Sequence, residues 1–307
     1  MATATLAHYA EYAALRGLLG ALAALSFERA GAIGERLGAL GYRPFGIRRA
    51  VVERQIAAAF PELAPTDVAR IARASYRHLG RTTVEAAVLP TFGRERVLSL
   101  FEGADGWHLI EEAQAAGKGI LFVTGHLGNW ELAGSYVAAR VERLHAVARH
   151  MANPLFDAYL TRTRERLGMR VVHDEQAVRQ VPRAVRDNRA VAMLIDQGAV
   201  GLASTWVPFF GRMAKTPRGP AVFSLRLGAP LIFGCALRQP SGKYRLAFER
   251  VEVERTGETE ADVDRIVAAY SETLERWVRK APEQYFWHHR RWKHQRPGTP
   301  PEIGDPS

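Results

Sequence analysis

The residues best suited to chemistry lie in one short segment, Thr124-Gly125-His126-Leu127-Gly128-Asn129-Trp130-Glu131. An imidazole and a carboxylate can act as a general base and the group that orients it. On one helix, side chains five positions apart would point about 140° from each other. The two glycines instead predict that His126 lies on a loop, with Asn129 capping the helix that follows and Glu131 in its first turn. In that arrangement His126 and Glu131 can converge.

The spacing by itself leaves another interpretation open, in which the histidine caps a turn and the glutamate only stabilises a helix start. A zinc site at His126 is disfavoured because the H-E-x-x-H pattern is absent and no cysteine lies nearby. The single cysteine, Cys235, excludes an intrachain disulfide and indicates a reducing compartment. We therefore expect neither a metal nor a cofactor at this site.

Strands and helices alternate from residue 105 onward, and these elements must position the segment. Apolar, β-branched runs predict strands, and periodic runs predict helices. The strands are expected at 119–124, 144–149, 170–173, 190–195, 231–237 and 244–254, and the helices at 130–140, 155–167, 175–186, 216–228 and 259–279. Thr216-Pro217 and the box Thr259 to Asp262 are the expected starts of the last two helices. The alternation predicts an α/β fold with a mixed, largely parallel sheet flanked by helices.

The first 44 residues differ in composition from the rest, being rich in leucine, alanine and glycine. Their longest uncharged apolar run, 17–27, has eleven residues, whereas a spanning helix needs roughly 20. Residues 1–44 therefore predict a helical membrane anchor or interfacial segment, or else an amphipathic helix packed on the domain. Residues 45–296 form the predicted catalytic domain, helical up to residue 100, and 297–307 a loose tail.

The chain is strongly basic, with a net charge of +10, which favours nucleic acid, anionic lipid or an acidic protein as partner. Tryptophan, histidine and arginine gather in residues 287–293. Such a run can stack on nucleic acid, lie at a membrane interface or pack inside the protein. We favour contact with a membrane surface or a phosphate group, and expect no nucleic-acid binding.

Six blocks, in order along the chain, resemble those of one family. The segment from His126 to Glu131 resembles the H-x4-D/E block of glycerolipid acyltransferases, and more closely that of the lipid A biosynthesis acyltransferases. The other blocks are Ala59-Phe60-Pro61-Glu62, Arg149 with Asn153-Pro154-Leu155-Phe156-Asp157, Asp196-Gln197, Pro208-Phe209-Phe210-Gly211 followed by Thr216, and residues 287–293. The chain departs from the family pattern at His150, where proline is usual, and at Gln55, where asparagine is common.

The resemblance implies transfer of an acyl chain from acyl carrier protein to a hydroxyl of a lipid A precursor or related glycolipid. His126 would remove the hydroxyl proton, and Glu131 would orient His126. The expected location is the cytoplasmic face of the cell inner membrane, with an anionic membrane surface as a further partner. The acyl donor is a substrate, so no cofactor is implied.

The resemblance also implies roles for residues outside the dyad. Arg164 would bind the oxyanion or an acceptor phosphate, Arg149 a phosphate, and Asn129 would contribute to substrate binding. Asp196 would orient Arg164 or another active-site group, although a simple turn at the strand end is an equal alternative. The alternatives for the whole protein are an acyltransferase for phosphatidylinositol mannoside or another lysolipid, a nucleic-acid-binding protein, and a non-catalytic scaffold that has kept the fold.

Overall fold

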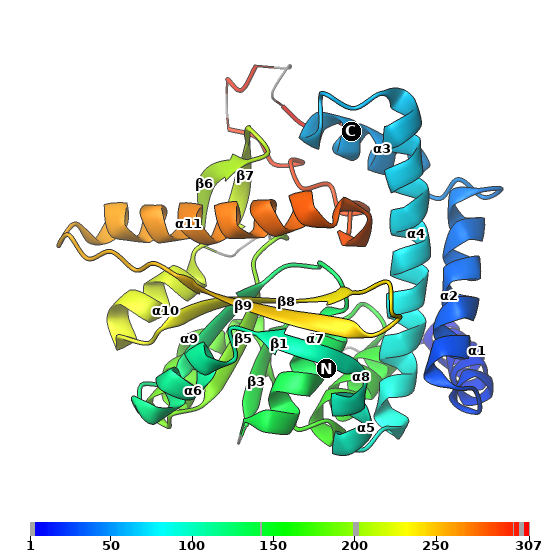
Figure 1. Cartoon of the computed structure of the whole chain (residues 1–307), viewed down its shortest axis with the longest axis horizontal. Coiled ribbons are helices and arrows are strands. Elements are labelled where there is room, and N and C mark those ends of the chain that lie inside the picture. Colours follow the sequence, from blue (N-terminus) through cyan, green and yellow to red (C-terminus); the bar gives the residue numbers. More distant parts are fainter. Residues whose placement is uncertain (1–3, 142, 199–202, 297, 301–303, 307) are drawn as a thin grey trace.

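A seven-stranded sheet organises the chain, as the alternation of strands and helices predicted (Figure 1). The computed structural model describes residues 4–141, 143–198, 203–296, 298–300 and 304–306. The strand order is β1-β9-β8-β2-β5-β3-β4, and every pair is parallel except β8–β9. The strands are β1 (Phe101–Asp105), β2 (Ile120–Thr124), β3 (Leu144–Ala148), β4 (Met169–His173), β5 (Ala190–Leu194), β8 (Leu231–Arg238) and β9 (Tyr244–Val251). The predicted α/β class with a largely parallel sheet is confirmed.

Helices cover both faces of the sheet, which explains why its central strands are apolar throughout. Leu121 and Val123 of β2 belong to the core that contains α9, α10 and α11. Ile120 and Phe122, which point to the other face, belong to the core that contains α5, α6 and α7. These helices are α5 (Arg94–Ser99), α6 (His108–Ala115), α7 (Trp130–Arg140), α9 (Ala177–Arg186), α10 (Gly219–Leu227) and α11 (Thr259–Lys280), and α8 (Pro154–Arg166) lies near α7 in Figure 1.

The expected start of a helix at Thr216-Pro217 is wrong. Both residues belong to β7 (Arg212–Pro217), which forms an antiparallel hairpin with β6 (Ser204–Phe209) beside α11 (Figure 1). The Thr216 hydroxyl accepts a 2.6 Å hydrogen bond from the buried Arg291 guanidinium instead of capping a helix. α10 begins at Gly219, with a proline in its first turn. Neither β1 nor this hairpin was predicted.

The last long helix was predicted correctly, but its expected capping box does not form. α11 begins at Thr259 and its N-cap is Glu258, which makes no side-chain cap bond. The Asp262 carboxylate accepts bonds from the backbone N–H and the hydroxyl of Thr256, which lies before the helix. Asp262 therefore binds Thr256 in the segment before the helix and does not form the expected capping box with Thr259.

The N-terminal part is helical, and one of its helices is packed tightly on the domain. It comprises α1 (Leu6–Ala23), α2 (Phe27–Tyr42), α3 (Arg49–Ala59) and α4 (Pro65–Val88), followed by the short turn η1 (Leu89–Thr91). Figure 1 shows α2 running beside the long α4. A Cβ added to Gly38 would lie 2.0 Å from the Tyr76 carbonyl oxygen, and one added to Gly80 would lie 2.1 Å from that of Gly34. The two backbones therefore touch, which larger side chains would prevent.

A buried arginine adds charge pairing to this helix contact. Arg81 of α4, whose side chain is 4% exposed, binds Glu28 and Glu35 of α2 at 3.1 and 2.6 Å and Glu85 of α4 at 3.0 Å. A buried guanidinium requires such partners, because an unpaired charge away from water is costly.

Within the described residues, none of the helices is long and apolar enough to cross a bilayer.

The α2–α4 contact predicts opposite effects for two glycine substitutions. Gly38→Ala should destabilise the fold by about 1–3 kcal/mol, because its methyl group meets a backbone carbonyl that cannot move freely. Gly20→Ala in α1 has no atom within 4 Å of the new methyl and should be neutral or stabilising by up to about 1 kcal/mol. Urea unfolding measures both variants. Equal stability of the two would contradict the close approach of α2 and α4.

Candidate active site

The parallel pairing of β2 with β5 brings two predicted residues together. Thr124 is paired with Leu194 at the ends of these strands, and the Ile195 N–H donates to the Thr124 carbonyl at 2.9 Å. His126 and Asp196 each lie two residues further on. Since carboxyl ends of parallel strands meet at one edge of a sheet, where active sites gather, the register places these two side chains opposite each other.

Asp196 binds His126 through both its side chain and its backbone. Nδ1 of His126 lies 2.8 Å from Oδ1 of Asp196, and the His126 backbone N–H donates to Oδ2 at 2.8 Å. An ionised carboxylate can only accept, so Nδ1 carries a proton and Nε2 is the basic nitrogen. Asp196 is buried, whereas the His126 side chain is 20% exposed. The arrangement is that of a general base held in one tautomer.

His126 lowers the pKa of the Asp196 carboxyl group and so keeps it ionised. Burial alone would raise the pKa of this carboxyl group, but the charge of His126 and its two hydrogen bonds outweigh burial and lower the pKa from 3.8 to about 2. Asp196 is therefore ionised at neutral pH. Because the folded-state pKa is the lower one, this interaction stabilises the fold above about pH 4, and that contribution is lost as the pH falls toward 2.

Aromatic side chains enclose the imidazole on two sides. The Trp130 ring meets it edge-on, with centroids 4.8 Å apart, and the Phe286 ring lies 5.7 Å away. The amide nitrogen of Gln197 is 3.4 Å from both ring nitrogens, so it does not point along the lone pair of either. The His126 side chain nevertheless remains partly exposed.

Glu131 does not make the orienting bond that we predicted for it. Its carboxylate binds Arg164 of α8 at two points, with Nε and Nη2 donating at 3.1 and 2.5 Å. Burial would lower the pKa of Arg164, but Glu131 outweighs it and raises that pKa. Asp196 thus occupies the place beside His126 that we expected Glu131 to fill, and Glu131 holds a partly buried guanidinium.

Asn129 supports the site from within the core. Its Oδ1 accepts the Leu132 N–H at 3.0 Å, which confirms the predicted helix cap. Its Nδ2 donates to Glu85 of α4 at 2.9 Å. Asn129 is fully buried, and its side chain binds the start of α7 and α4; its contact with substrate stays a prediction.

The loop between His126 and Asn129 is held from three directions. Gly128 has a φ of +63°, and a Cβ there would lie 1.9 Å from the Ala236 carbonyl oxygen, so only glycine fits. Its N–H donates to the Gln284 carbonyl at 2.9 Å, and its own carbonyl lies 3.1 Å from Nε2 of His78. Burial lowers the pKa of His78 to about 4, so this histidine is neutral and can donate that bond.

Two supports of the loop, His78 and Glu85, escaped the sequence analysis. Together with Arg81 and Thr82 they form a polar stripe on α4 that faces the loop and α2; Arg81, Thr82 and Glu85 are buried, and His78 is partly buried. Their spacing of three and four residues is the available signal, since polar residues on one buried face of a helix require partners.

Arg149 was predicted as a phosphate ligand. It follows β3, and in the sheet β5 lies between β3 and β2, the strand that precedes His126. It binds Asp174 at 2.8 Å in an exposed position.

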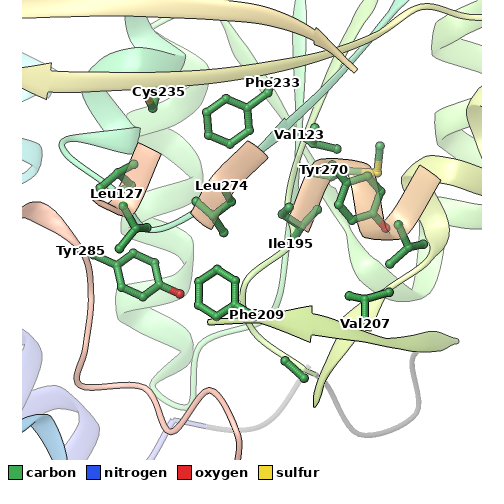
Figure 2. Packing of buried hydrophobic residues seen from close by; sticks show 14 of the residues in the cluster. Val123, Leu127, Ile195, Val207, Phe209, Phe233, Cys235, Tyr270, Leu274 and Tyr285 are labelled. Atoms are coloured by element: carbon green, nitrogen blue, oxygen red, sulfur yellow. The ribbon is translucent and has the colours of Figure 1, made fainter. Parts of the chain in front are cut away.

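The aromatic C-terminal run is mostly core, contrary to the membrane interpretation that we favoured. Trp287 and Trp292 are buried, and the Trp292 N–H donates to the Phe209 carbonyl at 3.3 Å. Arg291, also buried, donates to the Lys215 carbonyl at 2.8 Å. Residues 287–292 therefore fasten the β6–β7 hairpin. Figure 2 shows the adjoining core, in which Phe209 of the hairpin lies near Tyr285.

The carboxyl edge of a mixed α/β sheet thus carries a paired histidine and aspartate, an arrangement that can activate a hydroxyl nucleophile. The sequence profile described as bacterial lipid A biosynthesis acyltransferase matches residues 3–294. The chain belongs to this family, and it is an acyltransferase of the lipid A biosynthesis type.

Individual relatives are similar over most of the chain. The lipid A biosynthesis palmitoleoyltransferase of Escherichia coli (strain K12) is 28% identical over 264 residues, 85% of this chain and 84% of the relative. The lipid A biosynthesis lauroyltransferase of the same strain is 27% identical over 270 residues, 87% and 86% of the two chains. A phosphatidylinositol mannoside acyltransferase of Mycolicibacterium smegmatis is 27% identical over 175 residues, 56% of each chain.

The site predicts that Asp196, rather than Glu131, sets the tautomer of His126. Asp196→Asn should lower kcat roughly 10²- to 10⁴-fold, because an amide can hold the wrong tautomer and cannot stabilise the imidazolium. Proton NMR should show loss of the downfield Nδ1–H signal in Asp196→Asn and its retention in Glu131→Gln. Asp105→Asn, at an exposed pair with Arg245, is the control. Loss of the signal in Glu131→Gln alone would reverse the assignment.

The buried support predicts a stability defect for Glu85→Gln. This substitution leaves the Arg81 charge with one buried partner fewer and weakens the anchor of Asn129, so we expect a loss of about 3–5 kcal/mol. Glu112→Gln removes an exposed pair with Arg250 and should cost less than about 1 kcal/mol. Chemical denaturation compares the two, and equal midpoints would show that the buried network contributes no more than a surface pair.

Proposed function

We propose that this enzyme transfers a fatty acyl chain from acyl carrier protein to a hydroxyl of a lipid A precursor or closely related glycolipid. The observation that carries the proposal is the His126–Asp196 pair, with its 2.8 Å bond and a partly exposed imidazole, in a chain of the lipid A acyltransferase family. The two Escherichia coli relatives are named for lauroyl and palmitoleoyl transfer in lipid A biosynthesis, which supports an acyl chain as the transferred group.

His126 acts as the general base in this proposal. Nε2 removes the proton of the acceptor hydroxyl as its oxygen attacks the thioester carbonyl, and Asp196 stabilises the imidazolium that forms. The tetrahedral intermediate then expels the carrier's thiolate, which takes the proton back from Nε2. The products are an ester on the glycolipid and free acyl carrier protein, and the base is regenerated.

The oxyanion needs donors close to His126, and two sources are available. The first N–H groups of α7, those of Trp130 and Glu131, have no acceptor within the helix, and the helix dipole favours negative charge there. The second source is Arg164, which donates two bonds to the Glu131 carboxylate. We assign Glu131 to holding this guanidinium, and Arg164 to the oxyanion or a phosphate of the acceptor. Arg149 is the proposed ligand for a more distant phosphate.

We place the enzyme at the cytoplasmic face of the cell inner membrane. Large apolar side chains are exposed on the N-terminal helices and the loop after α2, where monomeric proteins usually avoid them: Leu6, Tyr9, Leu18, Leu37, Leu40, Phe45 and Ile47. Such a surface, in a chain of net charge +10, suits contact with an anionic lipid surface. The same charge would attract an acidic carrier protein.

A different acceptor is the second candidate, because phosphatidylinositol mannoside acyltransferases are also similar to this chain. That similarity extends over about half of each chain, whereas the lipid A enzymes match more than four fifths. Nucleic-acid binding loses its main support, since the two C-terminal tryptophans that would stack on bases are buried.

The direct test is acyl transfer with purified protein. Acyl carrier protein charged with C12, C14 or C16 chains is incubated with a tetra-acylated lipid A precursor, and mass spectrometry detects the added acyl chain. His126→Ala should reduce the rate roughly 10²- to 10⁴-fold, while His108→Ala, at an exposed position on α6, should retain it. Product with phosphatidylinositol mannoside alone would select the second acceptor, and full activity of His126→Ala would refute the general-base mechanism.

A further inference from the structure

A group of three potential metal ligands lies outside the catalytic pair. His150, Asp157 and His173 each offer one ligand atom, and these atoms lie within 4.8 Å of one another. Nδ1 of His150 is 2.7 Å from Oδ2 of Asp157. The two imidazole rings are stacked with centroids 3.6 Å apart and planes inclined by 14°.

The backbone brings these three residues together from separate elements. β3 and β4 are parallel neighbours, and Ala148 at the end of β3 is paired with His173 at the end of β4. His150 follows two residues after Ala148, which sets its ring against that of His173. Asp157 lies in the first turn of α8, and its Oδ1 accepts the Met151 N–H at 3.0 Å. The cluster is therefore held by two strand ends and a helix start.

One ring nitrogen of His173 has no other partner in the part of the chain that the structure describes. Nδ1 of His173 is buried and has no hydrogen-bond partner among the described residues, although a buried polar atom without a partner costs about 1–3 kcal/mol. His150 contacts Asp157 through Nδ1 and Glu175 through Nε2, at 2.7 and 3.4 Å, and neither contact involves Nδ1 of His173. An ion bound in the plane of the His173 ring by this nitrogen, and by the Asp157 carboxylate, would give it a partner.

The donor set selects the kind of ion. Two imidazoles and one carboxylate suit zinc and similar divalent transition metals, while magnesium and calcium prefer oxygen ligands. With ligand bonds of about 2.0–2.2 Å, two ligands of one tetrahedral zinc ion lie about 3.3–3.6 Å apart. The ligand atoms lie within 4.8 Å of one another, so they must approach by up to about 1.5 Å, and the stacked rings must turn so that a nitrogen of each faces the ion. The side chain of His150 is half-exposed and has room for this rotation.

We propose that His150, Asp157 and His173 bind one divalent transition-metal ion of the zinc type. Three protein ligands leave the fourth tetrahedral position for water or an anionic ligand. The ion would join the β3–β4 edge to α8, and so stabilise the position of the helix that carries Arg164, the partner of Glu131. It lies away from His126 in the strand order, so acyl transfer requires no chemistry from it.

Calorimetric titration of the chelator-stripped full chain with zinc chloride tests the proposal. We expect one equivalent per chain, weaker binding as the pH falls because the imidazoles protonate, and no binding of magnesium at the same concentrations. His173→Gln and His150→Gln should each weaken zinc binding at least tenfold. His108→Gln, which removes an exposed histidine outside the cluster, should bind like the wild type.

Thermal unfolding gives an independent readout. Zinc at 100 times its Kd should raise the melting temperature of the wild type and of His108→Gln, since a ligand that binds only the folded state stabilises it. The rise should be lost in His150→Gln, whose exposed side chain is not needed for folding. Equal zinc affinity in the wild type and both cluster variants would overturn the proposal and leave a histidine–carboxylate ion pair only.

Discussion

The bond between His126 and Asp196 is the interaction on which the site depends. It requires β2 and β5 to be adjacent, parallel and in register, because each residue follows its strand by two positions. Asp196 binds both the ring and the backbone N–H of His126. The same carboxylate therefore fixes the orientation of the imidazole and the conformation of the loop that begins at His126. The cost of burying this carboxylate is offset by those bonds, as its lowered pKa records.

The loop that carries His126 has a second layer of support besides Asp196. α4 provides that layer through His78 and Glu85, which bind the Gly128 carbonyl and the Asn129 amide. Glu85 also pairs with Arg81, which contacts α2 through Glu28 and Glu35. The N-terminal helix α2 is thereby linked to the catalytic loop, which gives it a structural role besides any contact with a membrane.

The C-terminal run illustrates how composition can mislead. Tryptophan beside arginine is typical of membrane interfaces, yet Trp292 and Arg291 are buried and bind the β6–β7 hairpin. The hairpin contributes Phe209 to the core shared with Tyr285 and Leu127 (Figure 2). The burial of Trp292 and Arg291 depends on contacts with a segment some 80 residues away in the sequence, and the local sequence pattern does not reveal such contacts.

The sequence by itself determined the α/β class, most strand positions, the helices α7 to α11 apart from the start of α10, the loop placement of His126 and the cap at Asn129. These follow from local rules: hydrophobic period, glycine at special backbone angles and capping chemistry. Only the tertiary structure decided which carboxylate serves His126. Glu131 is near in sequence, but it turns to Arg164 on α8, whereas Asp196, 70 residues away, lies opposite because β5 is inserted between β2 and β3. Strand order sets such pairings, and it arises from packing of the whole chain.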